Sequence, residues 1–349
     1  ARDLSGLAAG FAASARGAGT RRVYRSAWQG FAAWCATLGQ APLPADPEVI
    51  AWYITKRAHE GCAVATIRVD LAAIRTAHLL AGHPLDLRQP RLAMVLEGIT
   101  RSRGTRPRRQ AAPAVPDVLR LMLANLRSPA GPLAARETSV VREAIVAREA
   151  IVARGRAMLL LGFGAALRRG ELVALTLGDV TAVPGRGLKL LVRRSKTDQH
   201  AKGQEIAIWA NPAEPAFCPA AALERWLQHR REAPDLDWSG PETTRAARPL
   251  FCAISKRGKL SGAGLSDKAV VRLVKAAAAA AGLDPERYSG HSLRAGLATA
   301  AGDAGAGLAD LMRQTRHKST EVALGYLRPA DLWRNNVTEK LFRSGDRKD

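Results

Sequence analysis

The residues best suited to chemistry lie near the end of the chain, in the stretches HSLRAG (291–296), RHKS (316–319) and GYL (325–327). His291 and Arg294 are three residues apart, so they share one face of a helix. Tyr326 follows nine residues after His317. The groups gathered here are cations, imidazoles and one phenol, without a cluster of carboxylates. This mixture suits attack on a phosphodiester by a side-chain nucleophile without a metal ion.

The net charge of the chain indicates a polyanionic partner. The 349 residues, enough for two domains, include 53 Lys and Arg against 31 Asp and Glu, which gives a net charge of +22. Residues 1–110 carry 16 basic and 7 acidic side chains, a net +9, and the remainder carries 37 and 24, a net +13. Both parts are basic, so we expect that a polyanion could be held from two sides.

Other features of the composition favour a cytoplasmic protein. The four cysteines, Cys35, Cys62, Cys218 and Cys252, form no C-x-x-C pair and no Cys/His metal pattern, which predicts free thiols in a reducing compartment. No apolar run is long enough to span a membrane, and the first residues lack the pattern of a secretory signal. We expect a bacterial cytoplasmic location at the nucleoid, with no metal or other cofactor.

Residues 1–100 are predicted to form a small helical domain. Apolar residues recur every three or four positions between Tyr24 and Leu38, and Asp46-Pro47 is typical of a helix start. Trp28, Trp34 and Trp52 are interpreted as core residues because of their helical spacing. Further helices are expected over 66–82, with Thr66 as the cap, over 90–99, and over 4–11.

Residues 101–113 differ in character from both neighbours. Gly104, Pro107 and Pro113 interrupt any helix, which predicts a linker between domains. Its basic side chains are expected to contact phosphates, and the alternative is a linker that is only solvated. The candidate DNA-binding residues are Arg101, Arg103, Arg106, Arg108 and Arg109.

Residues 114–349 are predicted to form a second, mostly helical domain with a small β-sheet. The repeated REAIVA, at 142 and 148, lies in a long predicted helix and is assigned no chemistry. A strand, a turn around Lys196 and a second strand are predicted over 188–209, and a short strand over 249–253. Helices are expected over 163–175, 219–231, 266–281, 291–301, 308–315 and 320–327, with a break at Pro329 before a final helix over 332–342.

Five of these motifs, in this order, resemble those of the tyrosine recombinases, also called the phage integrase family. ALRRGEL (166–172) resembles the first-arginine motif, SKT (195–197) the hairpin lysine and HSLRAG the H-x-x-R box, while RHKS resembles the G-H-x-S box and Tyr326 the nucleophile. Arg316 stands where the family usually has glycine, and the alignment through Glu171 favours Arg168 over Arg169 as the first arginine. The final part is most similar to the simple Cre-type recombinases.

The resemblance implies a fold, a reaction and a set of roles. The fold is mainly α, with a SAM-like helical core-binding domain over 1–100 and a mixed catalytic domain over 114–349 that ends in an exchange helix. The reaction is site-specific recombination at inverted repeats in double-stranded DNA, through a 3′-phosphotyrosine and a tetrameric synapse. The implied catalytic residues are Arg168, Lys196, His291, Arg294, His317 and Tyr326, supported by Glu171.

Three alternatives differ in outcome or class. A type IB topoisomerase-like enzyme would relax DNA with the same chemistry, and a telomere-resolving enzyme is a further variant. A DNA-binding regulator would lack cleavage altogether. Synapsis of two sites separates the first from a recombinase, and covalent DNA adduct formation separates the last.

Overall fold

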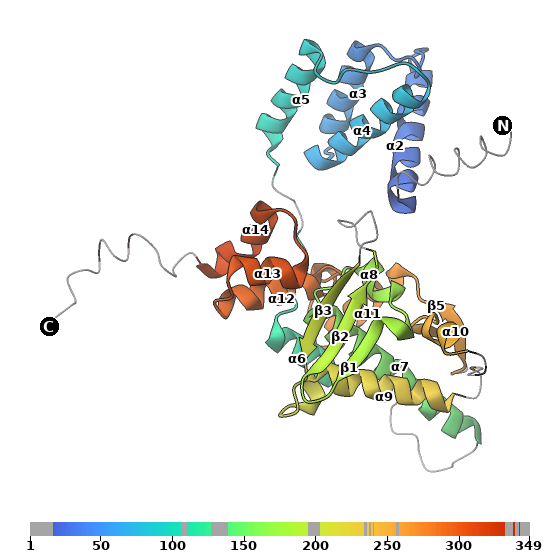
Figure 1. Ribbon diagram of the computed structural model, residues 1–349. Coiled ribbons are helices and arrows are strands. Elements are labelled where there is room, and N and C mark those ends of the chain that lie inside the picture. Colours follow the sequence, from blue (N-terminus) through green and yellow to red (C-terminus); the bar gives the residue numbers. More distant parts are fainter. Residues whose placement is uncertain are drawn as a thin grey trace. The chain divides into compact units, whose positions relative to one another are not determined.

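The chain divides into two compact units, residues 1–110 and 111–349, in the computed structural model (Figure 1). The structure describes residues 17–105, 110–126, 139–194, 203–233, 241–255 and 258–331, together with the single residues 236, 239, 338 and 342. The expected helix at 4–11 lies outside these residues.

The first unit is helical where it is described. Asp46 Oδ1 accepts a hydrogen bond of 2.8 Å from the amide of Glu48, so the predicted Asp-Pro start of the second helix is confirmed. Phe31, Ile50 and Ile74 lie in its apolar core, which forms between the helices. The described helices are α2 (Ala18–Thr37), α3 (Pro47–His59), α4 (Val64–Leu80) and α5 (Pro90–Arg103).

Two predictions in this unit were wrong. The third helix begins at Val64, with Ala63 as its N-cap, rather than at Thr66. Trp52 is not a core residue: it is 49% exposed, and its indole N–H donates to Glu48 one turn away. Trp28 and Trp34 do pack against the core, partly buried, as predicted.

The segment between the units belongs partly to each of them. α5 continues to Arg103, three residues into the expected linker. The amide of Ala112 donates to the carbonyl of Arg287 at 2.7 Å, and that of Ala114 donates to Ser292 at 2.9 Å. The end of the expected linker is therefore fixed to the second unit.

The second unit combines helices with two small antiparallel sheets. The three-stranded sheet has the order β1 (Val180–Val183), β2 (Gly187–Val192), β3 (Gln204–Trp209), and β4 (Cys252–Ile254) pairs with β5 (Leu260–Gly264). The prediction of a mainly α protein with small sheets is confirmed. The described helices are α6 (Pro116–Asn125), α7 (Ser139–Gly164), α8 (Arg169–Ala174), α9 (Pro219–Glu232), α10 (Glu242–Ala246), α11 (Asp267–Ala280), α12 (Ser292–Asp303), α13 (Leu308–Thr315) and α14 (Thr320–Asp331).

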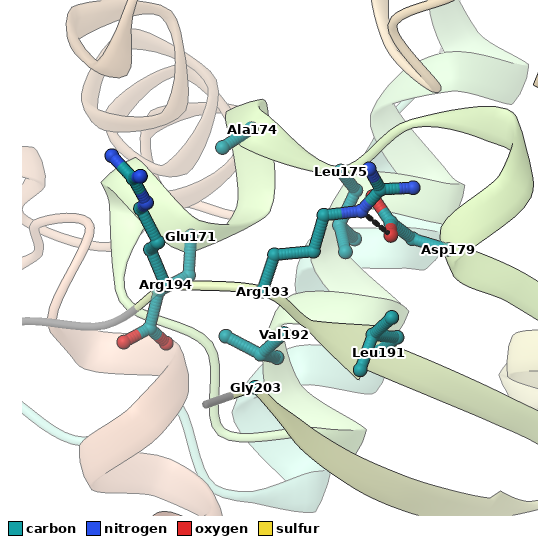
Figure 2. Close-up of a pocket in the computed structure, with 9 residues that line it drawn as sticks. All are labelled: Glu171, Ala174, Leu175, Asp179, Leu191, Val192, Arg193, Arg194 and Gly203. Carbon is teal, nitrogen blue, oxygen red and sulfur yellow. Dashed lines mark hydrogen bonds and ion pairs between the residues drawn. The ribbon is translucent and has the colours of Figure 1, made fainter. Parts of the chain in front are cut away.

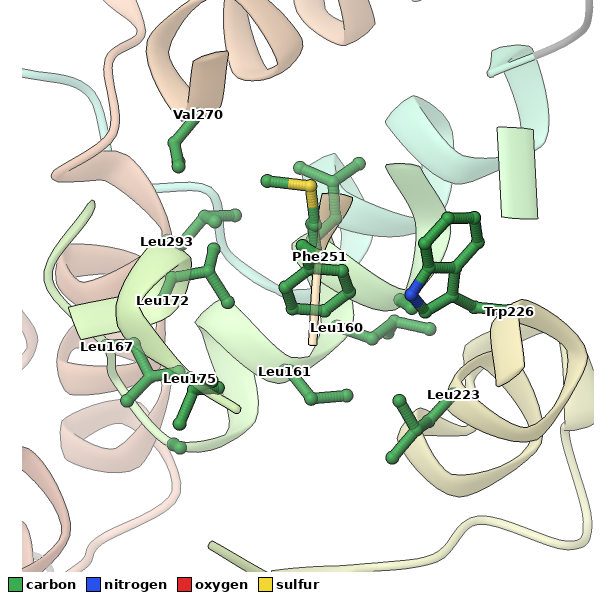
Figure 3. Packing of buried hydrophobic residues seen from close by; sticks show 14 of the residues in the cluster. Leu160, Leu161, Leu167, Leu172, Leu175, Leu223, Trp226, Phe251, Val270 and Leu293 are labelled. Carbon is green, nitrogen blue, oxygen red and sulfur yellow. The ribbon is translucent and has the colours of Figure 1, made fainter. Parts of the chain in front are cut away.

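The apolar core of this unit forms around α7, whose last turns are buried on all sides. Leu160 and Leu161 lie among Trp226 of α9, Phe251 and Leu293 of α12 (Figure 3). The buried area stabilises the unit at about 25 cal/mol per Å² of apolar surface. α12 packs against α7, which fixes the helix that carries the H-x-x-R box.

Two expectations for this unit need correction. The stretch 163–175 is not one helix, because α7 ends at Gly164 and α8 begins only at Arg169. Pro329 does not end the helix over 320–327, since α14 continues to Asp331. The predicted final helix over 332–342 lies almost wholly outside the described residues.

Candidate active site

The turn between α7 and α8 positions the first arginine. Ala166 has a φ of +47°, a left-handed conformation that bends the chain sharply. The buried carboxylate of Glu171 then accepts the backbone N–H of Arg168 at 2.9 Å and its Nη1 at 2.7 Å. Arg169 instead pairs with Asp267 on α11. Of the two adjacent arginines, Arg168 is the one held at Glu171.

The first turn of α12 supplies His291 and Arg294. His291 is the N-cap residue, and Arg294 is buried one turn further. Nη1 of Arg294 donates to the carbonyl of Ala166 at 2.7 Å, while its buried Nη2 has no hydrogen-bond partner in the described part of the chain. Burial, and then the positive charges of Arg168 and Arg316, lower the pKa of Arg294 to about 10, so the guanidinium stays charged at neutral pH.

The end of α13 orients His317. The hydroxyl of Thr315 donates its one hydrogen to the carbonyl of Leu311 at 2.6 Å. The same oxygen lies 2.8 Å from Nδ1 of His317, so it accepts a hydrogen bond from that nitrogen. The proton of a neutral His317 is thereby fixed on Nδ1, and Nε2 carries the lone pair.

Tyr326 on α14 lies between the two histidines. Its phenol oxygen is 2.8 Å from Nε2 of His291, and its ring stacks on that of His317 with centroids 5.5 Å apart and an interplanar angle of 14°. Burial raises the pKa of Tyr326, although Arg294 and Arg168 oppose that shift. The nucleophile candidate is thus protonated and next to a base.

Both histidines favour the neutral form. The ring of His291 reaches solvent but is crowded by neighbouring atoms, and this desolvation, with Arg294 and Arg168, lowers its pKa. Burial and the same arginines lower the pKa of His317 to about 4. A neutral imidazole beside a phenol can accept the phenol's proton.

Sequence reasoning did not assign Arg316 a role. This residue is buried, and its guanidinium donates to the carbonyls of Ala165 and Ala166 and to Glu171 Oε2. Its presence in place of the family's glycine was the only signal in the sequence. Thr315 was missed as well, because a threonine near a helix end is a common structural residue.

Lys196 lies outside the described residues, but the two ends of its segment are placed. Arg194 and Gly203 line the same pocket as Glu171 (Figure 2). The adjacent Arg193 pairs with the buried carboxylate of Asp179, which anchors the end of β2. The segment that carries Lys196 therefore begins and ends beside the site.

The predicted DNA-binding strip is described only in part. Arg101 is at the end of α5, its side chain is 81% exposed, and it pairs with Glu97 at 2.6 Å. Arg103 ends the same helix and is exposed. Arg106, Arg108 and Arg109 lie outside the described residues.

Metal and membrane features were sought in the described part of the chain. It contains no group of three or more His, Cys, Asp or Glu side chains arranged to hold a metal ion. No described helix is both long and apolar enough to cross a bilayer. Cys35, Cys218 and Cys252 are buried free thiols, and Cys62 is a partly exposed one.

Comparison with known proteins gives relatives over nearly the whole chain. An integrase/recombinase XerD homolog of Selenomonas ruminantium is 32% identical over 330 residues, which is 93% of this chain and 85% of the relative. The Cre recombinase of Escherichia phage P1 is 22% identical over 94% of this chain and 88% of its own length.

Solved structures share the fold. A lambda integrase fragment bound to a core site as a dimer aligns with a TM-score of 0.52 and 22% identity, covering 93% of both chains. The XerH recombinase bound to its palindromic difH substrate aligns with a TM-score of 0.53 and 18% identity, covering 85% of this chain and 71% of the other. The sequence pattern of the family described as "Phage integrase family" matches residues 138–332. The chain therefore belongs to the phage integrase family, the tyrosine recombinases.

Proposed function

We propose that this chain is a site-specific DNA recombinase that cuts and rejoins duplex DNA through a covalent bond to Tyr326. The observation that carries the proposal is the 2.8 Å contact between His291 Nε2 and the phenol oxygen of Tyr326. Two arginines are held in the same domain: Arg294 by the carbonyl of Ala166, and Arg168 by the buried carboxylate of Glu171. The recombinase relatives, which align over more than nine-tenths of the chain, support it.

In the cleavage step the phenol oxygen of Tyr326 attacks the scissile phosphorus. One P–O bond forms to the tyrosine and the P–O5′ bond breaks, which leaves a 3′-phosphotyrosine and a free 5′-hydroxyl. A phenol with a pKa of about 10 is a weak nucleophile until its proton is removed. His291 receives that proton. Rejoining reverses each transfer, with a new 5′-hydroxyl as the attacking group.

The arginines hold the nonbridging oxygens as negative charge builds up on them. Arg168 and Arg294 carry permanently charged, planar guanidiniums suited to two parallel hydrogen bonds. Nη2 of Arg294 has no hydrogen-bond partner among the described residues, which leaves it for phosphate. A phosphate beside Nε2 of His317 would favour its protonated form, in which that nitrogen donates to the same group.

Lys196 is proposed to protonate the leaving 5′-oxygen. The ends of its segment line the pocket of Glu171, within reach of the site. Lys196→Ala should cleave an ordinary site poorly but should recover on a substrate with sulfur at the 5′-bridging position, because a thiolate leaves without a proton. If the sulfur substrate gives no rescue, the proton comes from elsewhere, and Lys202 becomes the candidate.

We propose neither a metal nor a nucleotide cofactor. The covalent linkage to tyrosine conserves the energy of the phosphodiester, so rejoining needs no external energy source. Cleavage in the presence of EDTA and without ATP should match the rate in magnesium buffer. A strict requirement for either would contradict this part of the proposal.

The proposed substrate is double-stranded DNA with inverted-repeat sites, which places the protein at the nucleoid of a bacterial cytoplasm. The arginines between 101 and 109 supply part of the affinity through phosphates. Replacing all five with glutamine should flatten the dependence of log K on log salt by about 0.9 for each lost contact. An unchanged slope would mean that the strip is only solvated.

Four copies are proposed to assemble on two DNA sites, joined through the residues beyond α14. Because α14 continues to Asp331, a truncation after Asp331 removes the tail and keeps the helix that carries Tyr326. The truncated chain should bind and cleave a single site but should not join two sites. Normal recombination by this chain would refute the role of the tail.

A nicked suicide substrate tests the central proposal. The parent chain should form a DNA adduct that survives denaturation and maps to Tyr326, while Tyr326→Phe should bind DNA and form none. A second assay with two sites separates recombination from relaxation by a topoisomerase-like enzyme. An adduct on another residue, or no adduct at all, would overturn the proposal and would favour a regulator in the latter case.

A further inference from the structure

Arg316 occupies a backbone position that does not favour arginine. It ends α13 with φ +57° and ψ +39°, the left-handed conformation in which glycine is usual after a helix. A side chain with a Cβ pays roughly 1 kcal/mol or more to adopt it. Since the backbone disfavours arginine here, the side chain's contacts must account for it.

Those contacts lie deep in the domain. Only 3% of the Arg316 side chain is exposed. Nη1 donates to the carbonyl of Ala165 at 2.8 Å, and Nη2 donates to Ala166 at 3.2 Å and to Glu171 Oε2 at 2.8 Å. Ala166 is itself left-handed, so one guanidinium holds together the turn after α7 and the buried carboxylate of α8.

Both groups that Arg316 holds also hold the proposed phosphate-binding arginines. Glu171 accepts two hydrogen bonds from Arg168, one from its backbone and one from its side chain. The carbonyl of Ala166 accepts Nη1 of Arg294 at 2.7 Å. The guanidinium of Arg316 therefore connects Glu171, which holds Arg168, with the carbonyl of Ala166, which holds Arg294. Arg168 and Arg294 themselves come from separate parts of the sequence.

We propose that Arg316 is a positioning residue for cleavage: it fixes Glu171 and Ala166 so that the guanidiniums of Arg168 and Arg294 face one phosphate. Without Arg316, Glu171 would keep its ion pair with Arg168 but lose one of the two cations that contact it among the described residues, and the carbonyls of Ala165 and Ala166 would each lose a donor. The inference rests on the proposed function, because it concerns the same cleavage reaction.

A double-mutant cycle tests this role. Arg316→Gly relieves the backbone strain and removes the guanidinium, and Glu171→Gln removes the carboxylate charge that accepts one of its hydrogen bonds. At saturating suicide substrate, Arg316→Gly should slow adduct formation about tenfold or more in the parent, as expected for loss of a charge-assisted hydrogen bond. In the Glu171→Gln background, Arg316→Gly should slow adduct formation by a much smaller factor. If Arg316 served only to end the helix, Arg316→Gly would change the rate of adduct formation by the same factor in both backgrounds.

Controls keep the result interpretable. Arg313→Ala removes an exposed arginine one turn earlier in α13 and should leave the rate unchanged. If the glycine chain is too unstable, Arg316→Asn replaces it, because asparagine tolerates the left-handed conformation. Equal factors in the two backgrounds, or a parental rate for Arg316→Gly, would overturn the role of Arg316. Failure of the parent to form an adduct at Tyr326 would instead refute the proposed function.

Discussion

The phenol oxygen of Tyr326 and Nε2 of His291 lie 2.8 Å apart, which joins the last described helix to the start of α12. His291 favours the neutral form, because desolvation and Arg294 lower its pKa. A neutral Nε2 facing a protonated phenol is an acceptor already aligned with the proton that must leave. The contact therefore places the proposed nucleophile next to its proposed base.

His291→Ala should therefore slow strand cleavage and leave DNA affinity nearly unchanged. A positioned general base contributes roughly 10²- to 10⁴-fold. Single-turnover adduct formation on the suicide substrate measures the rate, and a filter-binding titration measures affinity. If the variant cleaves at the parental rate, the proton of Tyr326 must go elsewhere.

Thr315→Val should slow cleavage through His317. Valine matches threonine in shape but removes the oxygen that accepts Nδ1–H of His317, so the ring can turn and its tautomer is no longer fixed. A lost hydrogen bond of about 1.4 kcal/mol corresponds to a rate about tenfold lower. Thr315→Ser keeps the oxygen and should react like the parent. Equal rates for the valine and serine variants would show that this bond does not orient His317.

The candidate site residues could be recognised in the sequence because each motif combines particular residue types with a particular spacing. His291, Arg294, His317 and Tyr326 were predicted as site residues in this way, and the structure places them near one another and near Arg168. Helices with a clear apolar period, such as α3 and α13, were also predictable.

Features that depend on tertiary contacts were not predictable. The break after Gly164 follows from the left-handed Ala166, whose carbonyl is held by Arg294 and Arg316 from more than 100 residues away. Local propensity in FGAALRRGELVAL favours one continuous helix. In the same way, Trp52 has helical spacing but faces solvent, because periodicity alone does not say which helices cover a face.

Folding stability should fall as the pH falls below about 6.5. Below this value the imidazoles of the unfolded chain bind protons. Folded His317, with its pKa lowered to about 4, remains neutral, and the pKa of His291 is lowered too. The unfolded state therefore binds more protons in this window, and each such proton reduces stability by up to about 1.4 kcal/mol per pH unit.

Thermal unfolding at pH 7.5, 6.5 and 5.5 measures this effect above the range in which most carboxylates titrate. The chain with both His291→Asn and His317→Asn lacks the two imidazoles and should lose less stability between pH 6.5 and 5.5 than the parent. Parallel pH profiles for the two chains would contradict the lowered pKa values.

Gly296→Ala should destabilise the catalytic unit and distort its site. A Cβ on Gly296 would lie 2.1 Å from the carbonyl oxygen of Ala114, which is backbone and cannot rotate away. Ala114 is tied to the same helix, since its amide donates to Ser292. Alanine at position 296 would therefore push α12 away from the backbone of Ala114. Such overpacking lowers the free energy of unfolding by roughly 1–3 kcal/mol. Because α12 carries His291 and Arg294, the rate of strand cleavage should fall as well.

Gly170→Ala is the matched control, because Gly170 is a helical glycine with open space around it, and this change should keep or raise stability. Urea unfolding compares the two variants, and a parental midpoint for Gly296→Ala would show that α12 can shift freely.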